Sequence, residues 1–276
     1  MFYDNNLGGD LGYAKELLHE ISGLPFAGIG FQFSFNCLDD EEFVDLLAQA
    51  GGVMAFVGLE SLNQASLDGV RKRHNRVEGY ARSLARLRDR GIVSFSGMML
   101  GLDADTAAYY DELPRLLDTA GPSAIMVSIA IPIPGTPLHT ELQSAGRIAD
   151  TDLSHYDGDH VIVEPRSVTG EQVLATASRV HRSFYSWAAI ARRGLRLVAD
   201  TLGSGRPWSP RAWRRAAVAL VVFLSLSRFQ RYHGRRKFLA TSSGATRALL
   251  TTATQRCRAL YDSAIRSASS AWPVSR

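Results

Sequence analysis

Apolar runs and amphipathic stretches alternate along the first 145 residues of the chain. Short apolar, β-prone runs predict strands, and apolar residues at helical spacing predict helices between them. Strands that alternate with helices in this way indicate parallel βαβ units joined by right-handed crossovers, and therefore an α/β fold. The predicted strands cover residues 30–35, 53–57, 92–100 and 124–131, after the tail of an earlier strand at Phe2–Tyr3, and the predicted helices cover 13–21, 39–50, 66–90 and 106–119.

The pattern changes after Pro137. We expect an irregular connection with a short strand near residues 161–163, and then a long helix from Thr169 to about Arg193. A glycine-rich break at residues 203–207 separates that helix from a second, basic helix. The remainder of the chain is therefore predicted to be helical. Within the earlier part, the 66–90 helix is expected to break near His74–Asn75 and to stop at Gly91.

The charge divides near the same point. The formal net charge is +4, but residues 1–170 contain 12 Lys and Arg against 24 Asp and Glu, whereas residues 171–276 contain 19 against 3. We predict two domains, a βα domain over residues 1–166 and a basic helical domain over residues 167–276. The basic helices are expected to face phosphates, an anionic membrane surface or the acidic half of the same chain. No motif for specific nucleic-acid recognition accompanies this charge, so no specific nucleic-acid partner is expected.

The cysteines limit the chemistry. Cys37 and Cys257 are the only two, and they stand far apart with no ligand-like spacing. They exclude a disulfide framework and a self-contained cysteine-ligated zinc or iron–sulfur site, and they favour a reducing, cytoplasmic compartment. No metal site is therefore expected in this chain. The longest apolar run, residues 216–227, is 12 residues long, whereas a spanning helix needs about 20 apolar residues. We expect it to pack inside a helical domain or lie at an interface.

Polar residues follow the ends of the predicted strands, which is where barrels of parallel strands bind their ligands. Glu60 comes directly after an apolar strand and Gly58. Its carboxylate either accepts hydrogen bonds from ribose hydroxyls or an amino group, or caps a helix as a pair with Ser61. Asp4 and Asn5 either form a polar rim for an amino-acid ligand or belong to an ordinary turn.

Three further segments have two interpretations each. Asp103 and Asp105, after Gly101, either contact a ligand or cap the next helix, and their position favours the cap. The basic cluster at residues 71–76 is either a solvated helix turn or a contact for a carboxylate or phosphate. The segment at residues 132–137 has three prolines and a glycine, and its rigidity favours a pocket wall over simple chain reversal.

Together these segments resemble the radical S-adenosylmethionine superfamily, in the branch whose members carry an N-terminal cobalamin-binding domain. The resemblance extends from Phe2 to about Arg166, and the order and spacing of the segments are more specific than any one of them. Proteins of this branch also end in a basic helical region like residues 169–276. The segments are Phe2–Leu7, Gly58–Asn63, Arg73–Asn75, Gly91–Ile92, Gly101–Thr106, Pro132–Pro137 and Gly146–Arg147.

The resemblance implies a partial (β/α)6 TIM-like barrel, of which this chain has only the later strands, followed by a basic, all-helical C-terminal region. In such enzymes the barrel holds a 4Fe-4S cluster and S-adenosylmethionine. Reductive cleavage of the latter gives a 5′-deoxyadenosyl radical that abstracts hydrogen from a substrate, and members with cobalamin often transfer methyl groups.

The resemblance also implies roles for individual residues. Asp4 and Asn5 would lie near the methionine amino group of the cofactor, and Glu60 and Ser61 near its ribose or methionine part. The remaining implied residues are Gly101 and Asp103 in the cofactor-binding set, with Gly101 also shaping the substrate side, and Pro132, Pro134, Gly135 and Thr136 in the substrate-side loop.

One departure from the family concerns the mechanism. The CxxxCxxC motif, whose three thiolates leave one iron open for S-adenosylmethionine, is absent from this sequence, and so is the cobalamin domain. We therefore expect the C-terminal portion of a radical S-adenosylmethionine enzyme acting on an unidentified substrate. It would be inactive without an upstream, cluster-bearing half, and would bind S-adenosylmethionine weakly by itself. The alternative is a non-catalytic binding or interaction protein that keeps the βα scaffold.

Overall fold

A computed structural model of the protein describes residues 4–24, 28–72, 75–203 and 210–239, with side chains as far as His233. Residues 1–234 form one compact unit and residues 235–276 a second. The predicted strand tail at Phe2–Tyr3 lies outside the described residues. All four strands of the described sheet lie in the first unit.

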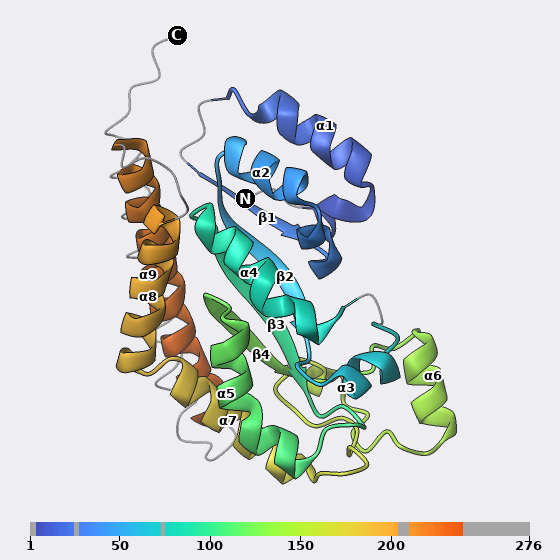
Figure 1. The fold of residues 1–276 in the computed structure, drawn as a ribbon. Helices are drawn as coiled ribbons and strands as arrows, with labels where there is room; N and C mark the ends of the chain where they lie inside the picture. The colour runs from blue at the N-terminus through green and yellow to red at the C-terminus, as the bar shows by residue number, and fades with distance from the viewer. Residues whose placement is uncertain (1–3, 25–27, 73–74, 204–209, 240–276) are drawn as a thin grey trace, which may run out of the picture. The chain divides into compact units, whose positions relative to one another are not determined.

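The sheet confirms the predicted α/β class. It contains β1 (Ile29–Phe33), β2 (Gly52–Glu60), β3 (Val93–Leu100) and β4 (Ala124–Ile129), in that spatial order and all parallel. Figure 1 shows the four strands side by side, with a helix in each connection. Because the strand order never reverses, the arrangement is that of consecutive βα units of a partial barrel, and differs from a doubly wound sheet, whose order reverses at a switch point.

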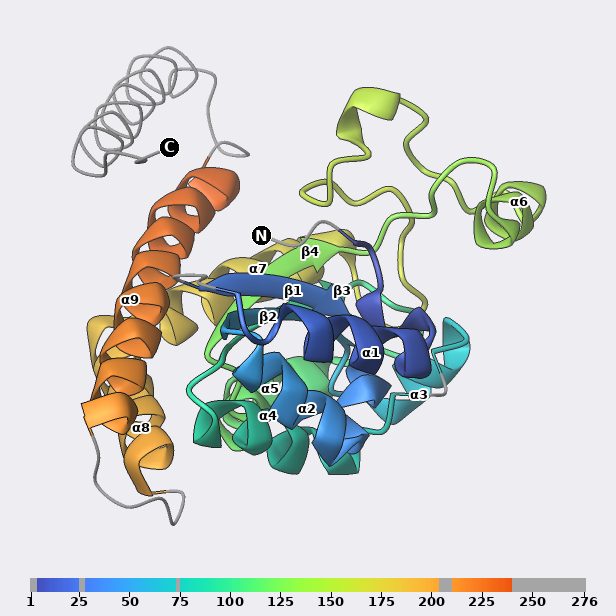
Figure 2. The same ribbon diagram turned by 90° about the horizontal axis from the view of Figure 1, so that it is seen from above.

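The helices that connect the strands lie on one side of the sheet (Figure 2). The described helices of this region are α1 (Leu11–Ile21), α2 (Glu41–Gln49), α3 (Gln64–Gly69), α4 (Tyr80–Asp89), α5 (Ala107–Ala120) and α6 (Pro137–Ser144). Gly91 follows α4 with a φ of +66°, and its N–H donates to Arg88 O, which confirms the glycine stop. The predicted 66–90 helix is interrupted as expected, because α3 ends at Gly69 and α4 begins only at Tyr80.

The two faces of the sheet differ in exposure. On β2, Ala55, Val57 and Leu59 are fully buried and point toward the helices. The alternate residues Phe56 and Glu60 are partly exposed on the opposite face. Successive side chains of a strand point to opposite faces, so burial of one set leaves the other set on the face that would be the interior of a barrel. The candidate site lies on this second face.

The helical region departs from prediction at one point. The helix predicted from Thr169 to Arg193 is two helices, α7 (Gly170–Phe184) and α8 (Trp187–Gly203), followed by α9 (Pro210–Leu239). The break arises because Ser186 caps α8: its Oγ accepts a hydrogen bond from Ala189 N at 3.3 Å. Helical periodicity runs through this cap, so the sequence pattern does not reveal it.

Tyr185, at the end of α7, attaches the helical region to the sheet. Its hydroxyl donates to Ile125 O on β4 at 2.7 Å and accepts from Ile125 N at 2.9 Å. Both groups of Ile125 belong to the last strand of the described sheet, where unpaired backbone groups would otherwise need partners. The helix α7 thus covers this edge of the sheet, with a buried tyrosine as the contact.

Ion pairs also join the two charge halves. Arg192 pairs with Asp118 at 2.8 Å and Arg179 with Asp111 at 3.4 Å, both between exposed side chains. Exposed pairs of this kind contribute little to stability. In a third pair the charges are exchanged between the halves: the cation is Arg88 of the acidic half, which is 3% exposed, and the anion is Asp200 of the basic half. Complementary charge between the halves therefore accounts for only part of the contact.

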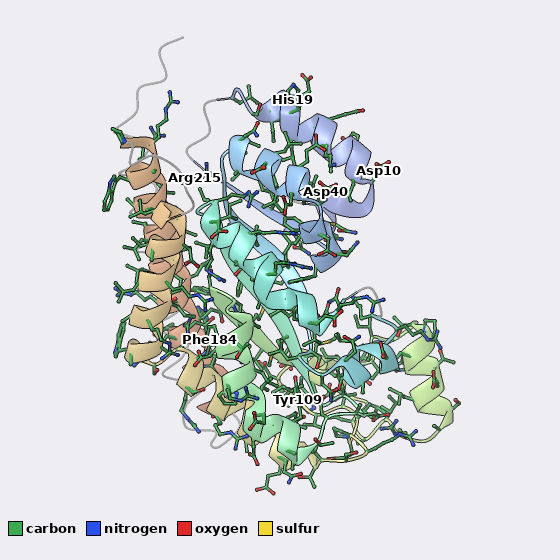
Figure 3. All side chains as sticks on the ribbon, in the orientation of Figure 1. Asp10, His19, Asp40, Tyr109, Phe184 and Arg215 are labelled. Atoms are coloured by element: carbon green, nitrogen blue, oxygen red, sulfur yellow. The ribbon has the colours of Figure 1, made fainter. Side chains whose placement is uncertain are left out.

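Helix α9 packs on the rest of the unit by its beginning and its middle. Arg215 donates from Nη2 to Ala48 O at the end of α2 (Figure 3). Gly194 of α8 permits close approach of Phe223, because a Cβ there would lie 3.2 Å from that ring. Within the described part of the chain, no helix combines the length and the apolar character needed to cross a membrane.

Replacing Tyr185 with phenylalanine should lower the free energy of unfolding by about 1–3 kcal/mol, because both polar groups of Ile125 lose their partner while remaining buried. Chemical denaturation of the full chain measures the change. Tyr13→Phe is the matched control, since Tyr13 is 60% exposed, and it should change stability by less than about 0.5 kcal/mol. Equal effects of the two substitutions would contradict the role assigned to Tyr185.

Candidate functional site

A polar cleft of about 220 Å³ lies where β1 and β2 end. Polar groups of both strand ends and of the segment before α4 contribute to it. This position, at the carboxyl ends of adjacent parallel strands, is the usual ligand-binding position of β/α folds. The cleft is lined by Asn5, Gln32, Phe33, Ser34, Phe35, Phe56, Gly58, Glu60, Lys72 and Asn75.

Glu60 adopts a backbone conformation that is rare for a residue with a side chain. Its φ is +63°, and Ser61 N donates to Leu59 O at 2.8 Å, which closes a γ-turn around Glu60. Such a conformation costs about 1–3 kcal/mol and is concentrated at functional sites. Gly58 makes room for the turned side chain, because a Cβ there would lie 2.5 Å from Glu60 Oε1. The turn places the carboxylate in the cleft.

The basic cluster at residues 71–76 supplies two residues to the cleft. Lys72 Nζ donates to Glu60 Oε1 at 3.2 Å, with Lys72 41% and Glu60 21% exposed. Asn75 Nδ2 donates to Gly58 O at 3.0 Å, and Asn75 Oδ1 is buried with no hydrogen-bond partner in the described structure. The interpretation of this cluster as a solvated helix turn is therefore wrong for Lys72 and Asn75. His74 and Arg73 lie outside the described residues.

Ser61 is not brought to the cleft. It is fully buried, and its Oγ lies 3.3 Å from the hydroxyl of Tyr109 on α5 (Figure 3). The Tyr109 hydroxyl also accepts from Leu62 N at 3.1 Å. The N-cap of α3 is Asn63, whose side chain accepts from Ala65 N, so the interpretation of Glu60 and Ser61 as a helix cap is wrong. The role of Ser61 toward a cofactor stays a prediction.

The two residues predicted from the start of the chain are placed differently. Asn5 lines the cleft together with Glu60, and its carbonyl accepts a hydrogen bond from Gln32 Nε2 at 3.3 Å. Asp4 is exposed outside the lining, and its Oδ1 accepts from Asn6 N at 2.9 Å in an ordinary turn. The structure thus brings together Asn5 and Glu60, two predicted residues that stand far apart in sequence.

Gly101 belongs to a turn after β3 that the buried Asp105 holds in place. Its φ is +88°, and its N–H donates to Asp105 Oδ2 and to the Tyr110 hydroxyl, both at 3.0 Å. Asp105 is fully buried and also accepts from Ser66 Oγ at 2.7 Å. Burial raises the pKa of Asp105, and these donors act in the opposite direction. Thr106, and not Asp105, caps α5, so the predicted cap is displaced by one residue.

Asp103 holds the irregular segment that follows β4. Arg147 donates to both oxygens of Asp103, at 2.7 and 2.6 Å, and Arg166 Nε donates at 3.1 Å. The Arg147 guanidinium lowers the pKa of the Asp103 carboxyl. A bidentate pair fixes orientation as well as distance. Asp103 therefore connects the end of β3 to residues 147–166, and its assignment to the cofactor stays a prediction.

The proline-rich segment after β4 leads into α6. Pro132 is buried, whereas Pro134 and Gly135 are exposed, with Gly135 at a φ of +84°. Thr136 caps α6 by accepting a hydrogen bond from His139 N at 3.3 Å. None of these residues lines the cleft at β1 and β2. Their assignment to the substrate side stays a prediction.

The residues present do not fit an iron–sulfur cluster. Such a cluster needs about three or four thiolates. Cys37 is 1% exposed, and burial raises the pKa of its thiol to about 11, which disfavours the thiolate. Cys257 lies outside the described residues. Within the described ranges, no group of three His, Cys, Asp or Glu side chains is arranged to hold a metal ion.

Known proteins similar to this chain include methyltransferases and a cyclase. The chain is 27% identical over 194 residues to the bacteriochlorophyllide d C-12(1)-methyltransferase of Chlorobaculum tepidum, a match covering 70% of this chain and 41% of the relative. It is 26% identical over 173 residues to the anaerobic magnesium-protoporphyrin IX monomethyl ester cyclase of Rubrivivax gelatinosus, covering 63% and 30%. The chain resembles radical S-adenosylmethionine methyltransferases and cyclases. It spans less than half the length of these two curated relatives.

A solved structure is also similar to this chain. The radical S-adenosylmethionine methyltransferase TsrM from Kitasatospora setae, with cobalamin and a 4Fe-4S cluster bound, is 17% identical with a TM-score of 0.45. The match covers 84% of this chain and 51% of that protein. No protein-family model matches the chain.

Replacing Asp103 with alanine should loosen the segment of residues 145–168 without unfolding the protein, because Asp103 is 45% exposed and its ion pairs are local. Hydrogen exchange of that segment should become faster, while the free energy of unfolding changes by less than about 1 kcal/mol. Asp111→Ala is the control, since Asp111 pairs with Arg179 elsewhere on the surface. Unchanged exchange in the Asp103 variant would show that other contacts hold the segment.

Proposed function

We propose that this chain is the part of a radical S-adenosylmethionine methyltransferase or cyclase that binds the ribose or methionine portion of S-adenosylmethionine. The observation that carries the proposal is the strained turn at Glu60, which holds a carboxylate in a polar cleft at the end of β2. The similarity to methyltransferases and to a cyclase supports the reaction class.

The groups lining the cleft suit the polar end of S-adenosylmethionine. The Glu60 carboxylate can accept hydrogen bonds from an amino group or from ribose hydroxyls, in place of its bond from Lys72. The unpartnered Oδ1 of Asn75 is a further acceptor close to the same strand end. The cleft is smaller than the roughly 300–1,000 Å³ typical of complete small-molecule pockets. We therefore infer that these residues hold only a portion of the cofactor.

We assign the binding of the 4Fe-4S cluster to residues other than the described ones. A 4Fe-4S cluster supplies the electron for reductive cleavage in this superfamily, and the described residues offer no ligand set for it. An upstream half that carries the three cysteines is the partner that this proposal requires. We propose in the same way that the complete enzyme uses cobalamin, the cofactor that the TsrM structure contains. What this chain contributes is binding and orientation of the S-adenosylmethionine portion near Glu60.

Glu60→Ala tests the proposal directly. Calorimetric titration of the chain with S-adenosylmethionine should show weak binding. The substitution should make the free energy of binding less favourable by about 1.5–3 kcal/mol, which weakens the affinity roughly 10- to 100-fold. Glu16→Ala, on the exposed side of α1, is the matched control and should bind like the native chain.

The melting curve of the same variant separates binding from structure. Alanine keeps a Cβ, so the strain of the turn at Glu60 stays. The melting temperature of the Glu60 variant should therefore be unchanged or slightly lowered, through the loss of the Lys72 ion pair. A lowered melting temperature with unchanged affinity would make Glu60 a structural residue. Absence of any S-adenosylmethionine binding by the native chain would favour a non-catalytic protein that keeps the βα scaffold.

Anaerobic reconstitution with iron and sulfide tests the assignment of the cluster elsewhere. We expect the 276-residue chain to take up less than one 4Fe-4S cluster per molecule and to release no 5′-deoxyadenosine, because two cysteines do not provide three thiolates. Absorbance and product analysis measure both. A stoichiometric cluster with cofactor turnover would refute the prediction.

A further inference from the structure

Helix α9 presents an apolar stripe on its outward face. One side of the helix packs against the protein, where Ala219 and Phe223 are fully buried and Ser227 is 1% exposed. On the opposite side, Val221 is 64% and Leu224 47% exposed. Together with Trp213, Ala217 and Arg228, which are also exposed, these residues recur at intervals of three and four, and therefore lie along one line of the helix.

Arg228 lies in this stripe, and Arg211 and Arg214 lie near the start of α9, where they also line a cleft with Ala48 at the end of α2. Arg211, Arg214 and Arg228 are exposed, and no ion pair found among the described residues involves any of them. The whole of α9 contains no Asp or Glu. Two of the three stand in the first turns, at the positive end of the helix dipole, where cations destabilise a helix. The dipole of α9 does not explain their position. The carboxyl end of α2 lines the same cleft and suits cations, and the exposed parts of these side chains can also bind an external anionic group.

We propose that the outward face of α9 docks on an anionic lipid bilayer. An amphipathic helix with arginines beside a stripe of large apolar side chains suits the membrane interface, where the apolar side chains enter the acyl boundary and the cations contact lipid phosphates. The helix lies on the surface and does not span it, since no described helix is long and apolar enough to cross. This inference is independent of the role of Glu60.

Charge and polarity select this partner over two others. A second copy of the chain would bring the same arginines face to face, which is unfavourable. A nucleic acid would engage the arginines through its phosphates but would leave Val221 and Leu224 without a partner. Only a surface that is both anionic and apolar below its charged layer matches both features.

Vesicle sedimentation of the full chain is the test. The chain should bind vesicles of phosphatidylcholine mixed with phosphatidylglycerol, bind far less to phosphatidylcholine alone, and be released by high salt. Neutralising the three arginines together (R211Q, R214Q and R228Q) should weaken binding about 100-fold, because each contributes about fivefold. The apolar pair Val221→Ser with Leu224→Ser should weaken it at least roughly tenfold.

Matched controls come from exposed residues elsewhere. The control variant combines Leu153→Ser with Arg82→Gln. Leu153 is 69% exposed in the segment before α7, and Arg82 is exposed on α4. This variant should bind like the native chain. Circular dichroism confirms that each variant is folded.

Several outcomes would overturn the proposal. One is an absence of binding to anionic vesicles, and another is binding that both α9 variants retain. A third is equal binding to phosphatidylcholine alone. Loss of vesicle binding in the arginine variant, with full binding in the apolar variant, would indicate a general polyanion-binding surface in place of a membrane-docking one.

Discussion

The carbonyl oxygen of Leu59 is the acceptor around which the candidate site is built. It accepts from Ser61 N at 2.8 Å, from the Tyr80 hydroxyl at 2.7 Å and from Asn75 Nδ2 at 3.5 Å. These donors come from the turn after β2, from α4 and from the segment before α4. The bonds hold the strand end in a γ-turn and so offset the strain at Glu60. The direction of the Glu60 carboxylate into the cleft depends on them.

The other strand ends serve mainly to hold the molecule together. After β3, Asp105 accepts hydrogen bonds from Gly101 N in the same turn and from Ser66 of α3, and Asp103 pairs with Arg147, so both carboxylates are engaged within the protein. After β4, Tyr185 occupies the polar groups of Ile125 and secures α7. The cleft at β1 and β2 instead brings polar groups from two strand ends and from the segment before α4 around one cavity, in Glu60, Lys72 and Asn5.

Much of the βα region follows from local pattern. The four strands and the helix before each of the last three were predicted to within a few residues, and Gly91 was recognised as a helix stop. These features depend on residues close in sequence, through apolar spacing and glycine conformation. Asn5 and Glu60 can be predicted as site residues because they follow strands. For Lys72 and Asn75 the sequence indicates only a basic cluster, since nothing near them in sequence shows that they reach β2.

The sequence by itself determined the parallel α/β class, the side chains available for chemistry and the absence of a cluster motif. Tertiary structure decided which of those side chains meet. Ser61 is buried in contact with Tyr109, and Asp103 forms an ion pair with Arg147, 44 residues later in the chain. Periodicity reports which face of an element is apolar, but hydrogen bonds between distant segments depend on how those elements are brought together in three dimensions. For that reason the strand ends could be predicted from sequence, whereas the cleft could be found only in the folded chain.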